Sequence, residues 1–135
     1  MKIDLEKAIR VFRDASAVKT AYLCGSYAQD TETRRSDLDF AFLSDKKMSM
    51  MEETQLQASL SESLSFEDID LVNLHRAPTR LQFNLVSTGK LIYERDQGYT
   101  DDYMEQLLKQ YHAKMHMYRT FQEDLEAGLR EDYGR

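Results

Sequence analysis

The sequence has no tryptophan, one cysteine, one proline and no long apolar run among its 135 residues. A single cysteine cannot form an intramolecular disulfide, and the apolar segment around Cys24 favours a small buried side chain over a nucleophile. No run is long and apolar enough to cross a bilayer, and the charged, amphipathic start MKIDLEKAIRVF is unlike a signal peptide. These absences predict a cytoplasmic protein.

Basic residues are also in deficit. The chain has 18 Lys and Arg against 24 Asp and Glu, which gives a formal net charge of −6 at pH 7. Such a charge repels long polyphosphates, and the basic pairs Arg34-Arg35 and Lys46-Lys47 are too short to reverse it. DNA and long RNA are therefore poor candidate substrates, whereas a small nucleotide that carries its own magnesium is less sensitive to net charge.

The hydrophobic pattern is that of an α/β protein. Asp4 and Ser49 (with Glu52 at capping-box spacing) each precede a segment of helical periodicity, and Pro78 is expected at the first position of another helix, which Gly89 ends. Short apolar runs predict strands over 20–24, 36–43, 69–74 and 91–93. The side chains expected to face the core include Ala8, Phe12, Leu56, Leu60, Leu64, Leu81, Leu85 and Val86, with Met48, Met50 and Met51 as packing residues. The length suits one domain, which we divide into a core of residues 1–94 and a helical extension of residues 95–135.

The polar stretch from Gly25 to Asp39 contains most of the residues that could bind a ligand or act in catalysis. Asp37 and Asp39 stand one residue apart in an expected strand, so their carboxylates point the same way while Leu38 points into the core. Paired carboxylates repel each other unless a cation lies between them, and their oxygens suit magnesium. Gly25 permits a sharp turn and close approach of the backbone to a ligand, and Ser26 offers a donor for phosphate. The combination indicates a metal–triphosphate site.

The loop between these motifs carries Arg34 and Arg35 next to the carboxylates. Two interpretations stay open: a solvated loop whose arginines balance nearby acids, or a loop in which one arginine contacts the triphosphate. Asp70 is unusual in another way, because it lies inside an apolar strand segment, where a carboxylate needs a cation or hydrogen-bond donors. It could also simply accept hydrogen bonds at a strand end.

The spacing of Gly25-Ser26, ten residues, then Asp37-Leu38-Asp39 resembles that of the nucleotidyltransferase superfamily typified by DNA polymerase beta. The whole chain is similar to the minimal members of that superfamily, the MntA-type antitoxins encoded beside HEPN-domain toxins. The resemblance implies a small mixed sheet flanked by helices and a long C-terminal helix. It also implies a third carboxylate from the next strand, for which Asp70 is the first candidate and Asp68 the second.

The resemblance further implies two Mg²⁺ ions held by Asp37, Asp39 and Asp70, with ATP as the substrate. Asp70 would also act as the base, and Gly25 and Ser26 would hold the β and γ phosphates. One departure is clear, because relatives commonly continue the Gly-Ser-Tyr-Ala start with arginine and glycine, whereas this chain has Gln29 and Asp30.

Three functions follow as alternatives. The resemblance favours an antitoxin that transfers AMP from ATP to a tyrosine hydroxyl of a HEPN-domain toxin. A second possibility is an antitoxin that neutralises its toxin by contact alone. The third is an adenylyltransferase of a small molecule, for which 135 residues leave little room to enclose the acceptor.

The C-terminal region predicts one long helix that starts near Thr100. Its apolar residues recur at alternating spacings of four and three, broken at Gln122. Either the stripe packs partly on a second copy or another chain, or the helix lies wholly across its own domain. His112 and His116 share one face but lack a converging third ligand, so we interpret them as a surface pair, and His75 as a structural or solvated loop residue. The stripe comprises Met104, Leu108, Tyr111, Met115, Tyr118, Leu125 and Leu129.

Overall fold

The computed structural model describes residues 3–29 and 37–133. It contains a four-stranded sheet in the order β3-β2-β1-β4, in which β1 runs antiparallel to β2 and β4 while β2 and β3 are parallel. The expected mixed sheet is confirmed. The elements are α1 (Leu5–Asp14), β1 (Val18–Cys24), α2 (Gly25–Ala28), β2 (Leu38–Ser44), α3 (Met50–Leu64), β3 (Ile69–Asn73), η1 (Leu74–Arg76), α4 (Thr79–Thr88), β4 (Lys90–Glu94) and α5 (Gln97–Tyr133).

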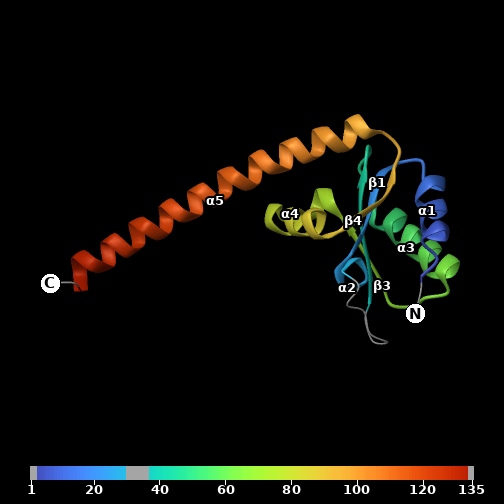
Figure 1. Ribbon diagram of the computed structural model, residues 1–135, viewed down its shortest axis with the longest axis horizontal. Helices are drawn as coiled ribbons and strands as arrows, with labels where there is room; N and C mark the ends of the chain where they lie inside the picture. Colours follow the sequence, from blue (N-terminus) through green and yellow to red (C-terminus); the bar gives the residue numbers. More distant parts are fainter. Residues whose placement is uncertain (1–2, 30–36, 134–135) are drawn as a thin grey trace.

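Helices cover both faces of the sheet, with α1 and α3 on one side and α4 and the start of α5 on the other (Figure 1). Because side chains alternate along a strand, β2 sends Leu38, Phe40 and Phe42 into the first layer and Ala41 and Leu43 into the second. Asp39 has the parity of Ala41, so it lies on the α4 side of the sheet. The two apolar layers thus leave the carboxylate at one end of the second layer.

The helix starts agree with the sequence signals. The Asp4 side chain accepts a hydrogen bond from the backbone amide of Glu6, and Ser49 and Glu52 form a complete capping box. Two packing predictions were wrong, because Met50 and Met51 in the first turn of α3 are 71% and 68% exposed. Their positions next to the cap place them on the solvent side of the helix, while Met48 is buried as expected.

The strands and α4 differ from the predictions in detail. Strand β2 spans 38–44 rather than 36–43, and β3 ends at Asn73, after which Leu74 begins a 3₁₀ turn. Pro78 caps α4 instead of occupying its first turn, and Gly89 ends the helix as predicted. Leu81 was expected to face the core but is 42% exposed, since it borders an open cleft described below.

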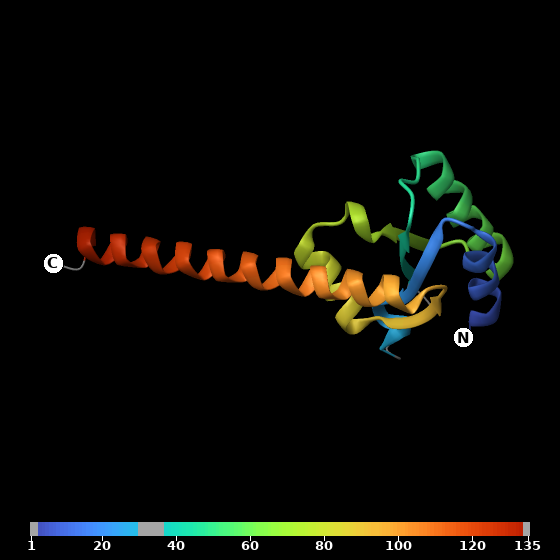
Figure 2. The ribbon, with the colours of Figure 1, turned by 90° about the horizontal axis from the view of Figure 1, so that it is seen from above.

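Helix α5 begins at Gln97, earlier than the predicted start near Thr100, and its first turns belong to the core. The hydroxyls of Thr20 and Thr100 are buried and 2.8 Å apart, and Leu107, absent from the predicted stripe, is 2% exposed. The helix has 37 residues, about 55 Å at the usual rise, and most of it runs clear of the other elements (Figures 1 and 2). Of the two alternatives, the one in which it lies wholly across its own domain is therefore wrong. Across the described residues, no helix is both long and apolar enough to cross a membrane.

Candidate active site

A cleft of about 500 Å³ opens where the end of β1 and the starts of β2 and β3 meet α4. Strands contribute its acidic floor, and α4 contributes a wall of apolar and amide or hydroxyl side chains. The lining residues are Cys24, Gly25, Gln29, Asp39, Phe40, Gln57, Asp70, Leu71, Val72, Leu81, Asn84, Leu85 and Thr88. Three residues of the predicted site, Gly25, Asp39 and Asp70, therefore line one cavity.

Gly25 directly follows β1 and touches the carboxylate of Asp39. Its backbone has φ of +70°, the left-handed region that L side chains rarely adopt. A Cβ atom at this position would lie 2.3 Å from Asp39 Oδ2. Glycine is thus required twice, for the turn and for the space, and Ser26 follows it in the single helical turn α2.

Asp39 is the central acid of the site. It pairs in register with Cys24 on one side and with Asp70 on the parallel strand β3 on the other. Burial raises the pKa of Asp39, and the negative charges of Asp70 and Asp37, together with a side-chain hydrogen bond to Asp70, raise it further. Asp37 precedes β2 by one residue and is exposed. The carboxylates therefore form a mutually repelling row at the strand ends.

Asp70 lies on an edge strand and is exposed, so the expectation of a buried carboxylate there was wrong. Asp68 lies before β3 and is exposed too, and it is not among the groups that raise the pKa of Asp39. In the described parts of the chain, no three His, Cys, Asp or Glu side chains lie close enough together to hold a metal ion. Asp39 and Asp70 are thus neighbours on the sheet, close enough for a side-chain hydrogen bond, without a third acid beside them among the described residues.

Cys24 and Gln29 also line the cleft, on either side of the turn at Gly25. Burial and the charge of Asp39 raise the pKa of the Cys24 thiol to about 12, which agrees with a packing role. Gln29 lines the cleft, whereas Asp30, Arg34 and Arg35 lie outside the described residues.

The wall formed by α4 was not predicted from the sequence. Leu81, Asn84, Leu85 and Thr88 lie three, four and seven residues apart, so they share one helix face toward the cleft. That spacing was available, but the inward prediction for Leu81 assigned the face to the core. Gln57 of α3 was missed as well; its side-chain amide donates to the Ile69 carbonyl and so braces the start of β3.

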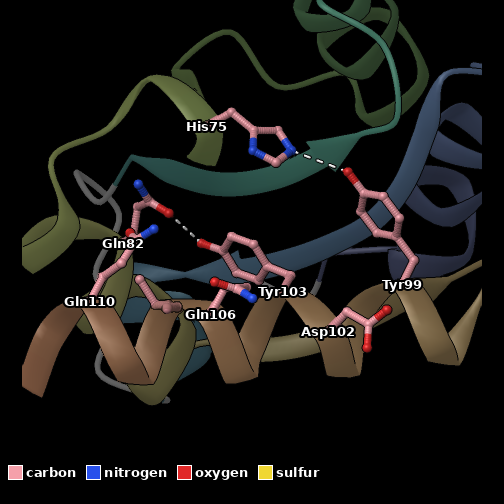
Figure 3. A pocket seen from close by; sticks show the side chains of 8 residues that line it. His75, Gln82, Tyr99, Asp102, Tyr103, Gln106 and Gln110 are labelled. Atoms are coloured by element: carbon pink, nitrogen blue, oxygen red, sulfur yellow. Dashed lines mark hydrogen bonds between the residues drawn. The ribbon is translucent and has the colours of Figure 1, made fainter.

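A second hollow, of about 460 Å³, lies between η1, α4 and α5 (Figure 3). The Tyr99 hydroxyl donates to the Ser44 carbonyl at 2.8 Å, and His75 Nε2 lies 3.3 Å from that hydroxyl. The Tyr103 hydroxyl donates to Gln82 Oε1 at 2.7 Å, and burial raises the Tyr103 pKa above its ordinary value. His75 is exposed and lies within hydrogen-bond distance of the Ser44 carbonyl and the Tyr99 hydroxyl, which agrees with its interpretation as a structural or solvated residue.

Comparison with known proteins agrees with the interpretation of this cleft as an active site. The profile of the family described as "Polymerase beta, Nucleotidyltransferase" matches residues 6–98. The protein adenylyltransferase MntA of Shewanella oneidensis is 33% identical over 97 residues, which are 71% of this chain and 69% of that protein.

Solved structures share the fold over nearly the whole chain. A chain from a toxin–antitoxin crystal structure with AMP-PNP superimposes with a TM-score of 0.77 at 27% identity, covering 91% of this chain and 98% of its own length. A mutant MntA–HpeT toxin–antitoxin structure gives a TM-score of 0.75 at 26% identity, with coverages of 93% and 99%. By sequence and by fold, this chain belongs to the polymerase beta nucleotidyltransferase family.

Proposed function

We propose that this chain is a Mg²⁺-dependent antitoxin that transfers AMP from ATP to a tyrosine hydroxyl of a HEPN-domain toxin. The observation that carries the proposal is the placement of Asp39 between the left-handed turn at Gly25 and the carboxylate of Asp70, inside one cleft. A turn without a side chain next to paired carboxylates suits a triphosphate with its cation. The relatives, a protein adenylyltransferase and chains of toxin–antitoxin complexes, support a toxin protein as the acceptor.

The proposed role of each residue in the reaction follows from its position. Asp37, Asp39 and Asp70 would hold two Mg²⁺ ions, and their carboxylate oxygens fit that cation, as does the mutual repulsion that a cation relieves. Bound magnesium would neutralise the triphosphate and stabilise both the attacking and the leaving oxygen. Gly25 and Ser26 would hold the β and γ phosphates, with Arg34 or Arg35 as a further phosphate contact.

The reaction is an in-line displacement at the α-phosphorus. The acceptor hydroxyl oxygen forms the new bond to phosphorus, the bond to the bridging oxygen of the β-phosphate breaks, and pyrophosphate leaves. The proton of the hydroxyl passes to a carboxylate, for which Asp70 is placed best because it lies at the exposed rim of the cleft. An open rim also suits an acceptor that is carried on another protein.

The test is intact-mass spectrometry of the chain incubated with MgATP and the protein that its adjacent gene encodes. We expect the partner to gain the mass of one or more AMP groups with the wild type and none with Asp39→Asn. Asp68→Asn is the matched control, because it removes the same charge from an exposed position that does not affect Asp39. Equal transfer by wild type and Asp39→Asn would refute the proposal.

The contact-only alternative is favoured by one observation, the long helix whose outer apolar residues have no partner within the described chain. It predicts that Asp39→Asn still neutralises the toxin in a ribonuclease or growth assay. The adenylyltransferase proposal predicts that neutralisation disappears together with the added mass.

A further inference from the structure

We infer that one face of α5, beyond the domain, is the docking surface that holds the acceptor protein next to the catalytic cleft. We name it the distal face and define it as Tyr118, Phe121, Leu125 and Leu129. These four side chains are 54%, 66%, 53% and 49% exposed. The inference rests on the proposed function for the identity of the acceptor, a HEPN-domain toxin.

The distal face continues the face by which α5 packs on its own domain. At about 100° per residue, the core-facing and distal residues fall within a stripe about 80° wide: Leu107, Tyr111, Tyr118, Phe121, Leu125 and Leu129. Leu107 is buried in the core, and Tyr111 stacks on Phe83 of α4 with ring centroids 3.9 Å apart. A single stripe therefore passes from intramolecular packing to full exposure as the helix leaves the domain.

The direction of this stripe decides where a bound protein would sit. Helix α4 lies in the angle between α5 and the sheet (Figure 1), and Lys114 Nζ donates to Thr79 at the start of α4 at 2.7 Å. The same side of α5 carries the distal face, so a protein docked there lies beside α4. In the view from above, no other element runs alongside the outer part of α5 (Figure 2).

The surface between the distal face and the cleft is continuous. A hollow beside α4 is lined by Pro78, Arg80, Leu81, Phe83, Asn84, Ser87 and Tyr111. Leu81 and Asn84 line both this hollow and the catalytic cleft. A protein that covers the distal face can thus extend over the Phe83–Tyr111 stack and place a side chain past Leu81 at the carboxylates.

The occupant is the acceptor and not a second copy, because a second copy would gain nothing from continuity with the cleft. The toxin–antitoxin chain with AMP-PNP covers 91% of this chain, a share that cannot be reached without α5 and its 37 residues. A relative solved with a toxin therefore has the same helix. The three-and-four spacing of the stripe further suits a partner that presents an apolar helix.

The experiment compares two glutamate substitutions on opposite sides of α5. Leu125→Glu places a charge in the distal face, whereas Ala127→Glu places the same charge about 180° away on an exposed position. Binding to the protein that the adjacent gene encodes is measured without nucleotide, by titration calorimetry, and AMP transfer is measured by intact mass. Circular dichroism and thermal unfolding of each variant show whether the fold is retained.

We expect Leu125→Glu to weaken binding at least tenfold and to lower the rate of transfer at limiting toxin, with Ala127→Glu within twofold of the wild type. Binding that is unchanged in Leu125→Glu would overturn the inference. So would a chain that sediments as a dimer and becomes a monomer in Leu125→Glu while it binds the toxin normally, since the occupant would then be a second copy. Because binding and transfer are measured separately, a wild-type chain that binds the toxin without transferring AMP refutes the proposed transfer and leaves the docking surface standing.

Discussion

Replacement of Asp39 by asparagine is expected to make the folded chain more stable at pH 7. The wild-type carboxylate is partly buried and faces the negative charges of Asp70 and Asp37, and all three effects raise its pKa. Asparagine keeps the shape of the side chain and removes the charge. The change therefore relieves repulsion that the sheet imposes on the folded state and that the unfolded chain escapes.

The size of the effect follows from the strand pairing. Asp39 and Asp70 are direct neighbours on β2 and β3, and adjacent strands lie about 4.8 Å apart. Two unit charges at about 5 Å repel by about 0.8 kcal/mol in bulk water and about 3 kcal/mol at an effective dielectric constant of about 20. Because Asp70 is exposed, the lower value applies, and we expect a gain of about 1 kcal/mol, or about 3–4 °C in Tm.

The stability gained by Asp39→Asn should depend on pH, and the direction of that dependence follows from the raised pKa of Asp39. Since the pKa of Asp39 is raised in the folded state, the folded chain binds this proton more tightly than the unfolded chain does. The stabilisation linked to that proton is fully present below the ordinary aspartate pKa and is lost as the pH rises through the raised value. The wild type thus carries the whole penalty at pH 7, and the advantage of Asp39→Asn should shrink on acidification.

Urea unfolding followed by circular dichroism, at pH 7 and near pH 4, measures both quantities. Asp68→Asn controls for the general benefit of removing one charge from a chain of net charge −6, and we expect it to change stability by less than about 0.5 kcal/mol. The reasoning is refuted if Asp39→Asn is less stable than the wild type at pH 7. It is equally refuted if the difference grows as the pH falls.

Two further predictions concern the turn that holds the site. Gly25→Ala should destabilise the chain by at least about 1 kcal/mol, from the left-handed backbone and the contact with Asp39, and should lower kcat/KM for AMP transfer. Gly128→Ala, in an open position on α5, should instead stabilise the helix by up to about 1 kcal/mol in the same thermal unfolding assay, and a loss of stability there would contradict the comparison. Gln29→Arg should place a cation in the cleft and lower the KM for ATP about two- to fivefold, whereas Gln29→Glu should raise that KM. If steady-state kinetics give the same KM for ATP in both variants, Gln29 does not contact the nucleotide.

Features set by local sequence were predicted well. The caps at Asp4 and Ser49 depend on residues within a few positions, and the side-chain alternation around Asp39 depends only on the period of a strand. Asp70 was different, since its role was suggested by family resemblance and by its unusual place in an apolar run. Asp70 lies next to Asp39 because β2 and β3 pair in parallel, and no local sequence pattern specifies that pairing.

The parts that were missed depend on what covers an amphipathic face. Periodicity shows that α4 and α5 each have an apolar side, but it does not say whether that side meets the core, a cleft or another protein. Leu81 was therefore assigned to the core although it borders the cleft, and Leu107 was left out although it is buried. The packing predictions for Met50 and Met51 were wrong for the same reason, because hydrophobic type alone does not establish burial.

The apolar core fixes the distance between the site's carboxylates. Leu38 and Phe40, on either side of Asp39, are fully buried, so the backbone of β2 cannot shift to move the carboxylate away from Asp70. Phe12 packs edge-on against Phe40 with ring centroids 5.6 Å apart, which ties this strand to α1 on the far face. The carboxylates of Asp39 and Asp70 therefore stay next to each other, close enough for a side-chain hydrogen bond. The packing of Phe40 against Phe12 in the opposite layer thereby helps to determine how closely the acids can share one ligand.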